Sequence, residues 1–308
     1  MVAIMKSYDQ IGRKEDISNI ISNITPTKTP FQSMIGSESI HNIVHSWQED
    51  ALAAVAANAA VEGADAPTAV HTATVLRTGT TQIFTKTAKV SGTTEAVDTY
   101  GRDRELAYQL SLKGAELKRD HEYAMVGVSQ AQITGSVSVA RQFASYLAQL
   151  DGTAVYTVNS TSGALNTALT SQTAAALRED IITLVSQTLY TNGSDPDCLM
   201  VKPADSLVLS GFQASGRTRF VDNGTRNITN VVDVYTSPFG TLKVYMNRFQ
   251  LASSALIFEA SMWKKLVLRN WARKTLAVTG DSTNIQLVGE FGLKHKNQAA
   301  SGGVINLT

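Results

Sequence analysis

The chain has 308 residues, of which 43% are hydrophobic and 17% charged, and its 27 basic side chains nearly balance its 26 acidic ones. This composition excludes intrinsic disorder for most of the chain, because disordered chains combine low hydrophobicity with high net charge. The net charge of +1 argues against a protein that mainly coats nucleic acid, since such domains carry a basic excess. A single cysteine, Cys198, excludes an internal disulfide and a thiolate zinc cluster.

Residues 1–40 are predicted to form an irregular, extended arm. Pro26 and Pro30 interrupt any periodic pattern, and each proline biases the residue before it toward extended geometry. Such an arm becomes ordered only against another surface. The sequence shows no secretory signal and no run of roughly eighteen apolar residues, so we expect a soluble protein made in a reducing compartment, with no membrane span.

The next part of the chain is predicted to be a projecting hairpin. Ala, Thr and Val supply 29 of the 47 residues in 51–97. The centre, 51–69, has the small side chains of a loop, and the flanking segments 43–48 and 80–91 look extended, the second with a clear period of two. Long loops of this kind rarely lie inside a compact domain, so we expect this one to project and to find its partner elsewhere.

Residues 102–128 are the strongest predicted helix. Apolar and aromatic positions recur on one of its faces at Leu106, Leu110, Leu117, His121, Ala124 and Val128. Asp98 and Thr99 precede it and are suitable capping residues. A helix of this size is about 40 Å long at 1.5 Å per residue, which exceeds a small domain. We therefore interpret it as a spine helix that lies along a sheet.

The second half of the sequence indicates an α+β arrangement. Helices are predicted over 174–191 and 203–212, and residues 211–230 are predicted to be a loop. Strands are predicted over 198–201, 231–235, 241–246, 256–258, 263–269 and 284–290. No internal repeat is evident.

No catalytic or metal-binding motif stands out. His41 and His45 are four residues apart but lack a third ligand and the glutamate of the zinc-protease motif. His121 is expected to be a half-buried, hydrogen-bonded histidine of the helix, and Cys198 a buried structural thiol. Phosphate-binding loops and nucleophile elbows are also missing, so we expect neither a cofactor nor an enzyme.

Residues 263–274 combine five cations with two tryptophans. One hypothesis is a nucleic-acid contact, in which Lys264, Lys265, Arg269 and Arg273 neutralise phosphates while the indoles stack on bases. The alternative is a strand whose long side chains pack their stems and bond to the carboxylates of neighbours. The near-zero net charge favours the alternative.

The order of these parts, together with five local segments, resembles the major capsid proteins of tailed phages, which have the HK97 fold. The segments are 29–36 (TPFQSMIG), 45–50 (HSWQED), 59–63 (AAVEG), 100–122 (from YGR to KRDHE) and 289–296 (from Gly289 to Lys296). The resemblance implies an α+β HK97-like fold that covers nearly the whole chain. Its parts would be an N-terminal arm (1–44), an extended loop (45–97), a peripheral domain with the spine helix (98–170), an axial domain (171–250) and strands that return to the peripheral domain (251–308).

The resemblance also implies a function. Proteins of this kind assemble into hexamers and pentamers of an icosahedral phage head that encloses double-stranded DNA. The expected partners are further copies of the chain, a portal, a scaffolding or decoration protein and DNA bound without sequence specificity, with no membrane. The protein would be assembled in the host cytoplasm and located in the virion. The residues expected at subunit interfaces are Leu52, Val55, Val61, Glu62, Arg102, Glu116 and Arg119.

Two alternatives from other classes stay open on the sequence. One is a nucleic-acid-binding protein that uses residues 263–274. The other is an encapsulin-like compartment shell.

Overall fold

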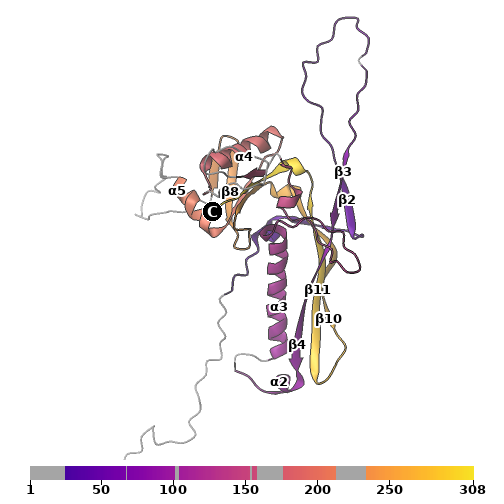
Figure 1. Ribbon diagram of the computed structural model, residues 1–308, viewed down its shortest axis with the longest axis vertical. Coiled ribbons are helices and arrows are strands. Elements are labelled where there is room, and N and C mark those ends of the chain that lie inside the picture. Colours follow the sequence, from indigo (N-terminus) through magenta and orange to yellow (C-terminus); the bar gives the residue numbers. More distant parts are fainter. Residues whose placement is uncertain (1–24, 67, 101–103, 153–154, 158–175, 213–233) are drawn as a thin grey trace, which may run out of the picture.

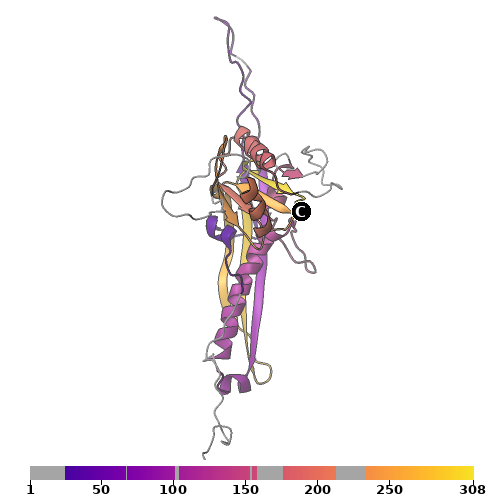
Figure 2. The same ribbon diagram turned by 90° about the vertical axis from the view of Figure 1, so that its left-hand side faces the viewer.

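The computed structural model describes residues 25–66, 68–100, 104–152, 155–157, 176–212 and 234–308, and the structural statements below concern these residues. The molecule is elongated. A long helix beside long strands forms one end, a compact α/β part lies in the middle, and a bare loop projects at the other end (Figure 1, and edge-on in Figure 2). None of the described helices is both long enough and apolar enough to cross a membrane.

A four-stranded sheet with the order β1-β10-β11-β4 forms the long end. Its strands are β1 (Gly36–Ser39), β4 (Gln82–Ser91), β10 (Trp263–Thr275) and β11 (Ser282–His295). β11 is antiparallel to both β10 and β4, whereas β1 is parallel to β10. Two helices follow β4, namely α2 (Gly92–Ala96) and α3 (Glu105–Glu122). α3 lies along β4 and β11 (Figure 1).

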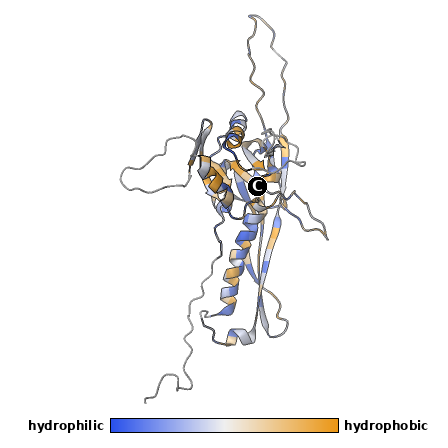
Figure 3. Ribbon diagram, turned by 60° about the vertical axis from the view of Figure 1, so that its left-hand side comes forward, coloured by the Kyte–Doolittle hydropathy of each residue, from blue (hydrophilic) through white to orange (hydrophobic). Residues whose placement is uncertain are grey.

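The alternation of β4 explains how the spine helix α3 is held. Phe84, Ala88 and Val90 are buried, and the residues next to them in sequence are exposed or half-buried, so the strand presents one apolar face to the helix. Lys86 shares this face and pairs with Asp120 of α3 at 3.0 Å. Hydrophilic and hydrophobic residues alternate along α3 (Figure 3), as expected of a helix with one buried stripe.

The start of α3 differs from the prediction. The helix begins at Glu105, so Asp98 and Thr99 do not cap it. Instead, Glu95 at the end of α2 accepts a hydrogen bond from the backbone N–H of Leu106 at 3.2 Å. This carboxylate satisfies one of the N–H groups left free in the first helical turn, and its negative charge is favourable there. The capping residue comes from a separate short helix, which the local sequence pattern did not reveal.

The end of the predicted helix also changes character. α3 ends at Glu122, and a wider π-helical turn, η2 (Tyr123–Gly127), continues it. A side chain at Gly127 would clash with the ring of Tyr123 and the backbone oxygen of Phe249, so the close approach here requires glycine. The spine therefore passes into the compact part of the molecule through an irregular turn.

The projecting hairpin is confirmed, but its second strand was assigned wrongly. β2 (Val44–Glu49) pairs with β3 (Val75–Thr80), and not with the segment 80–91. Most of that segment is β4 of the spine sheet. The chain changes sheets at Thr81, which is fully buried and donates its N–H to the Ile43 oxygen at 3.1 Å. The period-two run found in the sequence belongs to β4, whereas β3 shows no regular alternation of burial, so the pattern did not mark the second strand of the hairpin.

A six-stranded sheet with the order β5-β12-β9-β6-β8-β7 forms the compact part. Its strands are β5 (Val155–Thr157), β6 (Cys198–Val201), β7 (Val234–Ser237), β8 (Gly240–Met246), β9 (Ser254–Phe258) and β12 (Ser301–Ile305). The longer helices here are α4 (Glu179–Thr191) and α5 (Pro203–Phe212). The described residues also form the short helices α1 (Pro30–Met34), η3 (Leu147–Gln149), η5 (Ala260–Met262) and η6 (Gln298–Ala300).

Most predictions for this part are confirmed where residues are described. The strand over 198–201 and the helix over 203–212 have the predicted bounds. The helix predicted over 174–191 is confirmed from Glu179 onward. Most of the loop predicted over 211–230 lies outside the described residues.

The six-stranded sheet separates two hydrophobic cores. Leu256 and Phe258 of β9 belong to one core, and Ala255 and Ile257 belong to the other. A strand buried on both faces reads as a continuous apolar run, which is what the sequence shows here. Cys198 of β6 lies in the first core as predicted, and burial raises the pKa of its thiol to about 12.

Candidate assembly surfaces

Residues 50–74, which form the tip of the extended loop, project from the rest of the chain (Figure 1). Every described side chain in this tip is exposed. Leu52, Val55 and Val61 have relative exposures of 98%, 103% and 81%, and Glu62 is exposed beside them. Scattered single apolar residues are normal on a protein surface, but a whole projecting segment of exposed small and aliphatic side chains is a candidate interaction site. The structure thus places four of the predicted interface residues on one unpartnered segment.

The spine helix carries two further predicted interface residues. Glu116 forms ion pairs within its own chain, because the ammonium groups of Lys113 and Lys86 lie 2.9 Å and 3.6 Å from its carboxylate. The hydrogen bond from Lys113, with the charge of Lys86, lowers the pKa of Glu116. Arg119 is half-exposed and makes no ion pair with the described residues. Arg102 lies outside the described residues.

Trp263 cannot act as a base-stacking residue. Its side chain is fully buried and donates from Nε1 to Oγ of Ser301 at 2.9 Å. Its ring stacks on His295 at 4.0 Å and on Tyr146 at 4.5 Å between ring centroids. This part of the nucleic-acid hypothesis was wrong, because the composition of the segment does not show which tryptophan enters the core.

The four cations named in the nucleic-acid hypothesis have different surroundings. Arg269 donates from Nε to the buried Glu290 at 2.9 Å. Lys265 lies over the ring of Phe291 at 5.8 Å, and burial lowers its pKa. Lys264 is half-exposed and Arg273 is exposed. Only part of this cluster therefore faces solvent.

Glu290 is a buried carboxylate that the sequence analysis missed. Its side chain accepts hydrogen bonds from Thr81 Oγ1 at 2.8 Å, from Arg269 and from Arg141. These partners lie far from Glu290 in the sequence except for Arg269 on the neighbouring strand. The cluster lies at the point where the chain leaves the β2–β3 ribbon and enters β4. No spacing in the sequence could have indicated it.

Glu122 is a second buried carboxylate that sequence reasoning missed. It is fully buried and accepts hydrogen bonds from the N–H groups of Phe31 at 2.8 Å and Gln32 at 2.9 Å. Asn247 donates to it at 2.7 Å. Burial raises the pKa of Glu122, and these hydrogen bonds oppose the rise. The contacts fasten α1, and with it the end of the N-terminal arm, to the spine helix.

His121 differs from the expectation of a half-buried, hydrogen-bonded residue. It is 1% exposed, and its Nε2 has no hydrogen-bond partner among the described residues. The rings of Phe84 and Phe291 lie 5.1 and 5.0 Å away. Burial lowers the pKa of His121 to about 3, so the imidazole is neutral and packs as an aromatic ring.

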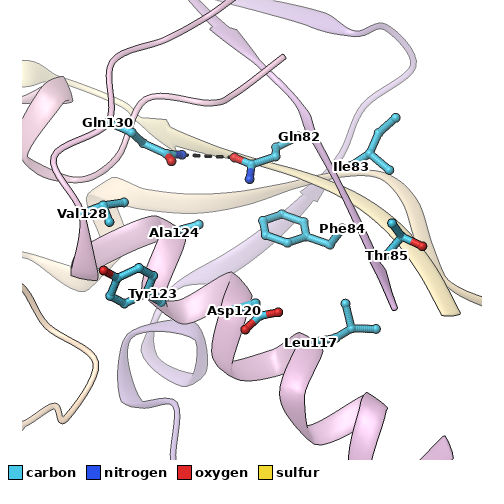
Figure 4. A pocket seen from close by; sticks show the side chains of 10 residues that line it. All are labelled: Gln82, Ile83, Phe84, Thr85, Leu117, Asp120, Tyr123, Ala124, Val128 and Gln130. Atoms are coloured by element: carbon cyan, nitrogen blue, oxygen red, sulfur yellow. Dashed lines mark hydrogen bonds between the residues drawn. The ribbon is translucent and has the colours of Figure 1, made fainter. Parts of the chain in front are cut away.

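One open hollow of about 360 Å³ lies between α3 and β4 (Figure 4). Phe84, Leu117 and Tyr123 line it together with polar groups that include Asp120. Asp120 pairs with Lys86, which is outside the lining, and the residues that line the hollow include no His, Cys or Lys. Within the described ranges, no group of three or more His, Cys, Asp and Glu side chains is placed to hold a metal ion.

A spine helix along a long-stranded sheet, a second α/β sheet and a projecting loop together define the architecture of a shell-forming protein. A structure from Microbacterium phage Oxtober96 matches with a TM-score of 0.63 and 13% identity over 99% of both chains. The capsid of a native GTA particle matches with a TM-score of 0.62 and 10% identity over 98% of both chains. The holo-SrpI encapsulin complex from Synechococcus elongatus PCC 7942 matches with a TM-score of 0.60 and 9% identity over 99% of this chain and 96% of that one.

At such identities these likenesses show the fold alone, which is the HK97-like fold. The sequence comparisons are more specific. The family model described as SU10 major capsid protein matches residues 4–308. The major capsid protein of Escherichia phage Phieco32 is 32% identical over 335 aligned residues, which cover 96% of this chain and 95% of that protein. The chain belongs to the SU10 major capsid protein family.

Family membership decides between the alternatives that the sequence left open. The chain is a major capsid protein of a tailed-phage head, a structural protein and not an enzyme. It assembles with copies of itself into the shell of the virion. The likeness to an encapsulin reflects the shared fold.

Proposed function

We propose that the chain forms hexamers and pentamers that close an icosahedral head around double-stranded DNA, and that the extended loop of each copy lies on a neighbouring copy. The observation that carries this proposal is the complete exposure of Leu52, Val55 and Val61. Burying one such side chain contributes about 1.5–3 kcal/mol. A contact that buries all three stabilises association substantially.

The spine helix supplies the second part of the proposed interface. Arg119 is a half-exposed cation without an ion pair among the described residues, and Glu62 on the loop is an exposed anion. Opposite charges on two interacting surfaces fix the register of an assembly more than they add to its affinity. Glu116 contributes by holding Lys113 and Lys86 in place along the spine, and Arg102 is proposed with Arg119 from its position in the sequence.

The proposed division of the subunit starts from the bounds expected from the resemblance, although β4 within the loop range joins the spine sheet, and β9 and β12 within the last range join the six-stranded sheet. These are an arm over 1–44, an extended loop over 45–97, a peripheral domain over 98–170, an axial domain over 171–250 and returning strands over 251–308. The proposed further partners are a portal and a scaffolding or decoration protein. Packaged DNA would contact the inner face without sequence specificity, and the exposed Arg273 and half-exposed Lys264 are candidates for that contact.

A loop variant tests the proposal. Deletion of residues 52–66 should leave a folded subunit that makes no shells, because every deleted side chain is exposed and none belongs to a core. Circular dichroism measures folding, and negative-stain microscopy measures shell formation. Normal shells from this deletion would contradict the proposed role of the loop.

A milder variant with a matched control separates loop contacts from general surface effects. The triple substitution Leu52→Ser, Val55→Ser and Val61→Ser should reduce shell yield strongly. Val137→Ser changes an equally exposed aliphatic side chain, 110% exposed, outside the loop. The control should assemble at least as well as any single loop substitution.

A further inference from the structure

The root of the extended loop holds one imidazole nitrogen between two opposite charges. Nε2 of His45 lies 3.3 Å from Nζ of Lys294 and 3.4 Å from Oε1 of Glu38. Nζ of Lys294 also lies 3.2 and 3.1 Å from the two carboxylate oxygens of Glu38. We call these three residues the root cluster. They come from β2, β11 and β1, so the cluster joins the loop ribbon to the spine sheet and to the end of the arm (Figure 1).

One ring nitrogen cannot serve both charged neighbours in the same way. A neutral imidazole with its proton on Nδ1 accepts at Nε2, and its partner is then the ammonium of Lys294. A protonated imidazole donates at Nε2, and its partner is then the carboxylate of Glu38. In the second state two cations stand 3.3 Å apart, at the distance between His45 and Lys294. The two protonation states therefore favour different arrangements of the root.

The other groups around His45 carry no charge. Trp47 of the same strand stacks on its ring with the centroids 6.2 Å apart, and Gly79 of β3 is its partner in the ribbon. Further along the ribbon, Arg77 and Glu49 satisfy each other at 3.0 Å. Among the described residues, the charged groups that face His45 are thus Glu38 from β1 and Lys294 from β11.

We propose that the root cluster is a proton-controlled clamp on the extended loop. At neutral pH Lys294 holds Glu38 and His45 together, and the ribbon is fixed on the spine sheet. When His45 takes up a proton, it competes for Glu38 and repels Lys294, so the ribbon is released from the sheet. The consequence for assembly, in which the clamp aims the loop at a neighbouring copy, rests on the proposed function of the loop.

The lowered pKa of His45 agrees with a root that is ordered at neutral pH and released by acid. Burial and the charge of Lys294 lower the pKa of His45, and the charge of Glu38 opposes them. A folded-state pKa below the usual value means that the ordered root binds fewer protons than a free imidazole does. The stability that the root gains from the neutral ring is therefore present above the unfolded pKa and is lost as the pH falls below it.

Hydrogen exchange on the unassembled full-length chain tests the clamp. The amides of β2 and β3 are measured at about pH 7.5 and about pH 5.5, corrected for intrinsic rates, with the amides of β9 as an internal reference. In the natural chain the exchange of the root amides should rise about two- to fivefold at the lower pH, the size expected from a partly exposed charge contact. In His45→Gln, which accepts from Lys294 but cannot take up a proton, exchange should not respond to pH.

Two further variants complete the test. Glu38→Gln should raise root exchange at both pH values, because Lys294 loses its carboxylate. The matched control His41→Gln removes an exposed histidine near the ribbon and should keep the natural response. An unchanged pH response in His45→Gln would overturn the clamp. Equal protection of the β2 and β3 amides of the natural chain at both pH values would also overturn the clamp. This measurement does not depend on the folding of any variant.

Failure of the clamp and failure of the proposed function give different results. The clamp is measured in single subunits and needs no assembly. If the loop-deletion variant makes normal shells while the natural root still responds to acid, the proposed loop interface fails and the clamp stands.

Discussion

The indole of Trp263 stacks on the imidazole of His295 with the ring centroids 4.0 Å apart and 6° between the ring planes. Both side chains are fully buried, and burial lowers the pKa of His295 to about 4, so two uncharged rings form the stack at neutral pH. Trp263 begins β10 and His295 ends β11, and the two residues are paired across these strands. The stack therefore anchors the long hairpin of the spine sheet in the core of the compact part.

Trp263→Ala should destabilise the subunit by about 3–5 kcal/mol, because it removes the stack and leaves a large cavity. Ser301 would also lose the hydrogen bond from the indole. Trp271→Ala is the matched control, since this second indole on β10 is 36% exposed and should cost clearly less. Urea denaturation of both variants measures the difference, and equal losses would show that the stack is not the anchor.

The buried Glu290 should make a large contribution to stability. Glu290→Gln removes the charge that compensates Arg141 and Arg269, and breaking such a buried pair costs about 3–5 kcal/mol. Arg269→Gln should cost less, because that guanidinium is 49% exposed and the carboxylate keeps Arg141 and Thr81. Chemical denaturation compares the two. A larger loss for Arg269→Gln would contradict the central role of the carboxylate.

Acid should weaken the spine through His121. Its folded-state pKa of about 3 lies below the usual 6.5, so the unfolded chain binds the proton and the folded chain does not. Stability from this residue is complete above pH 6.5 and should fall by about 2 kcal/mol between pH 7 and pH 5. In His121→Phe that part of the loss should disappear, because a phenyl ring packs without titrating.

The control for His121 is His41, which is exposed. His41→Gln should keep the full acid sensitivity when the urea midpoint is measured at both pH values. His295 is also buried with a lowered pKa and should retain its own share of the loss in His121→Phe. An acid response in His121→Phe equal to that of the natural chain would refute the prediction.

Elements with strong local patterns were predictable from the sequence. The continuous apolar run Cys198–Val201 gave a strand buried on both faces, and Pro203 opened the helix that follows it. The apolar stripe with Leu117 and His121 predicted the spine helix. The alanine-rich loop was predicted to project because long loops rarely lie inside a compact domain. In each case the local sequence already contains the physical cause.

Contacts between distant segments were not predictable from the sequence. Arg141 and Glu290 are 149 residues apart, and nothing in the local pattern of either marks it as buried and paired. Glu122 looked like one of many charges on the spine helix, yet it lies fully buried against Phe31. The change of sheet at Thr81 was equally hidden, because Thr81 alone separates β3 from β4 in the sequence.

Two glycines should respond in opposite ways to an added methyl group. A Cβ at Gly289 of β11 would meet Trp271 at 2.5 Å and Phe291 at 2.6 Å, so Gly289→Ala should cost about 1–3 kcal/mol. A Cβ at Gly114 of α3 would meet nothing within 4 Å, so Gly114→Ala should stabilise the chain by about 0.4–1 kcal/mol. Thermal unfolding of the two variants checks the signs, and a destabilising Gly114→Ala would mean that the spine helix packs more closely there than the structure shows.

Charge reversal at Arg119 should affect assembly more than folding. Arg119→Glu removes a half-exposed cation that has no ion pair among the described residues, and exposed single charges contribute at most about 1 kcal/mol to stability. If Arg119 faces an anion of a neighbouring copy, the reversal places like charges together, and shell yield should fall most at low salt. Lys118→Glu makes the same change at an adjacent exposed residue that points in another direction around the helix. Light scattering at several salt concentrations measures assembly, and equal effects of the two variants would show that general repulsion, and not a contact of Arg119, weakens the shell.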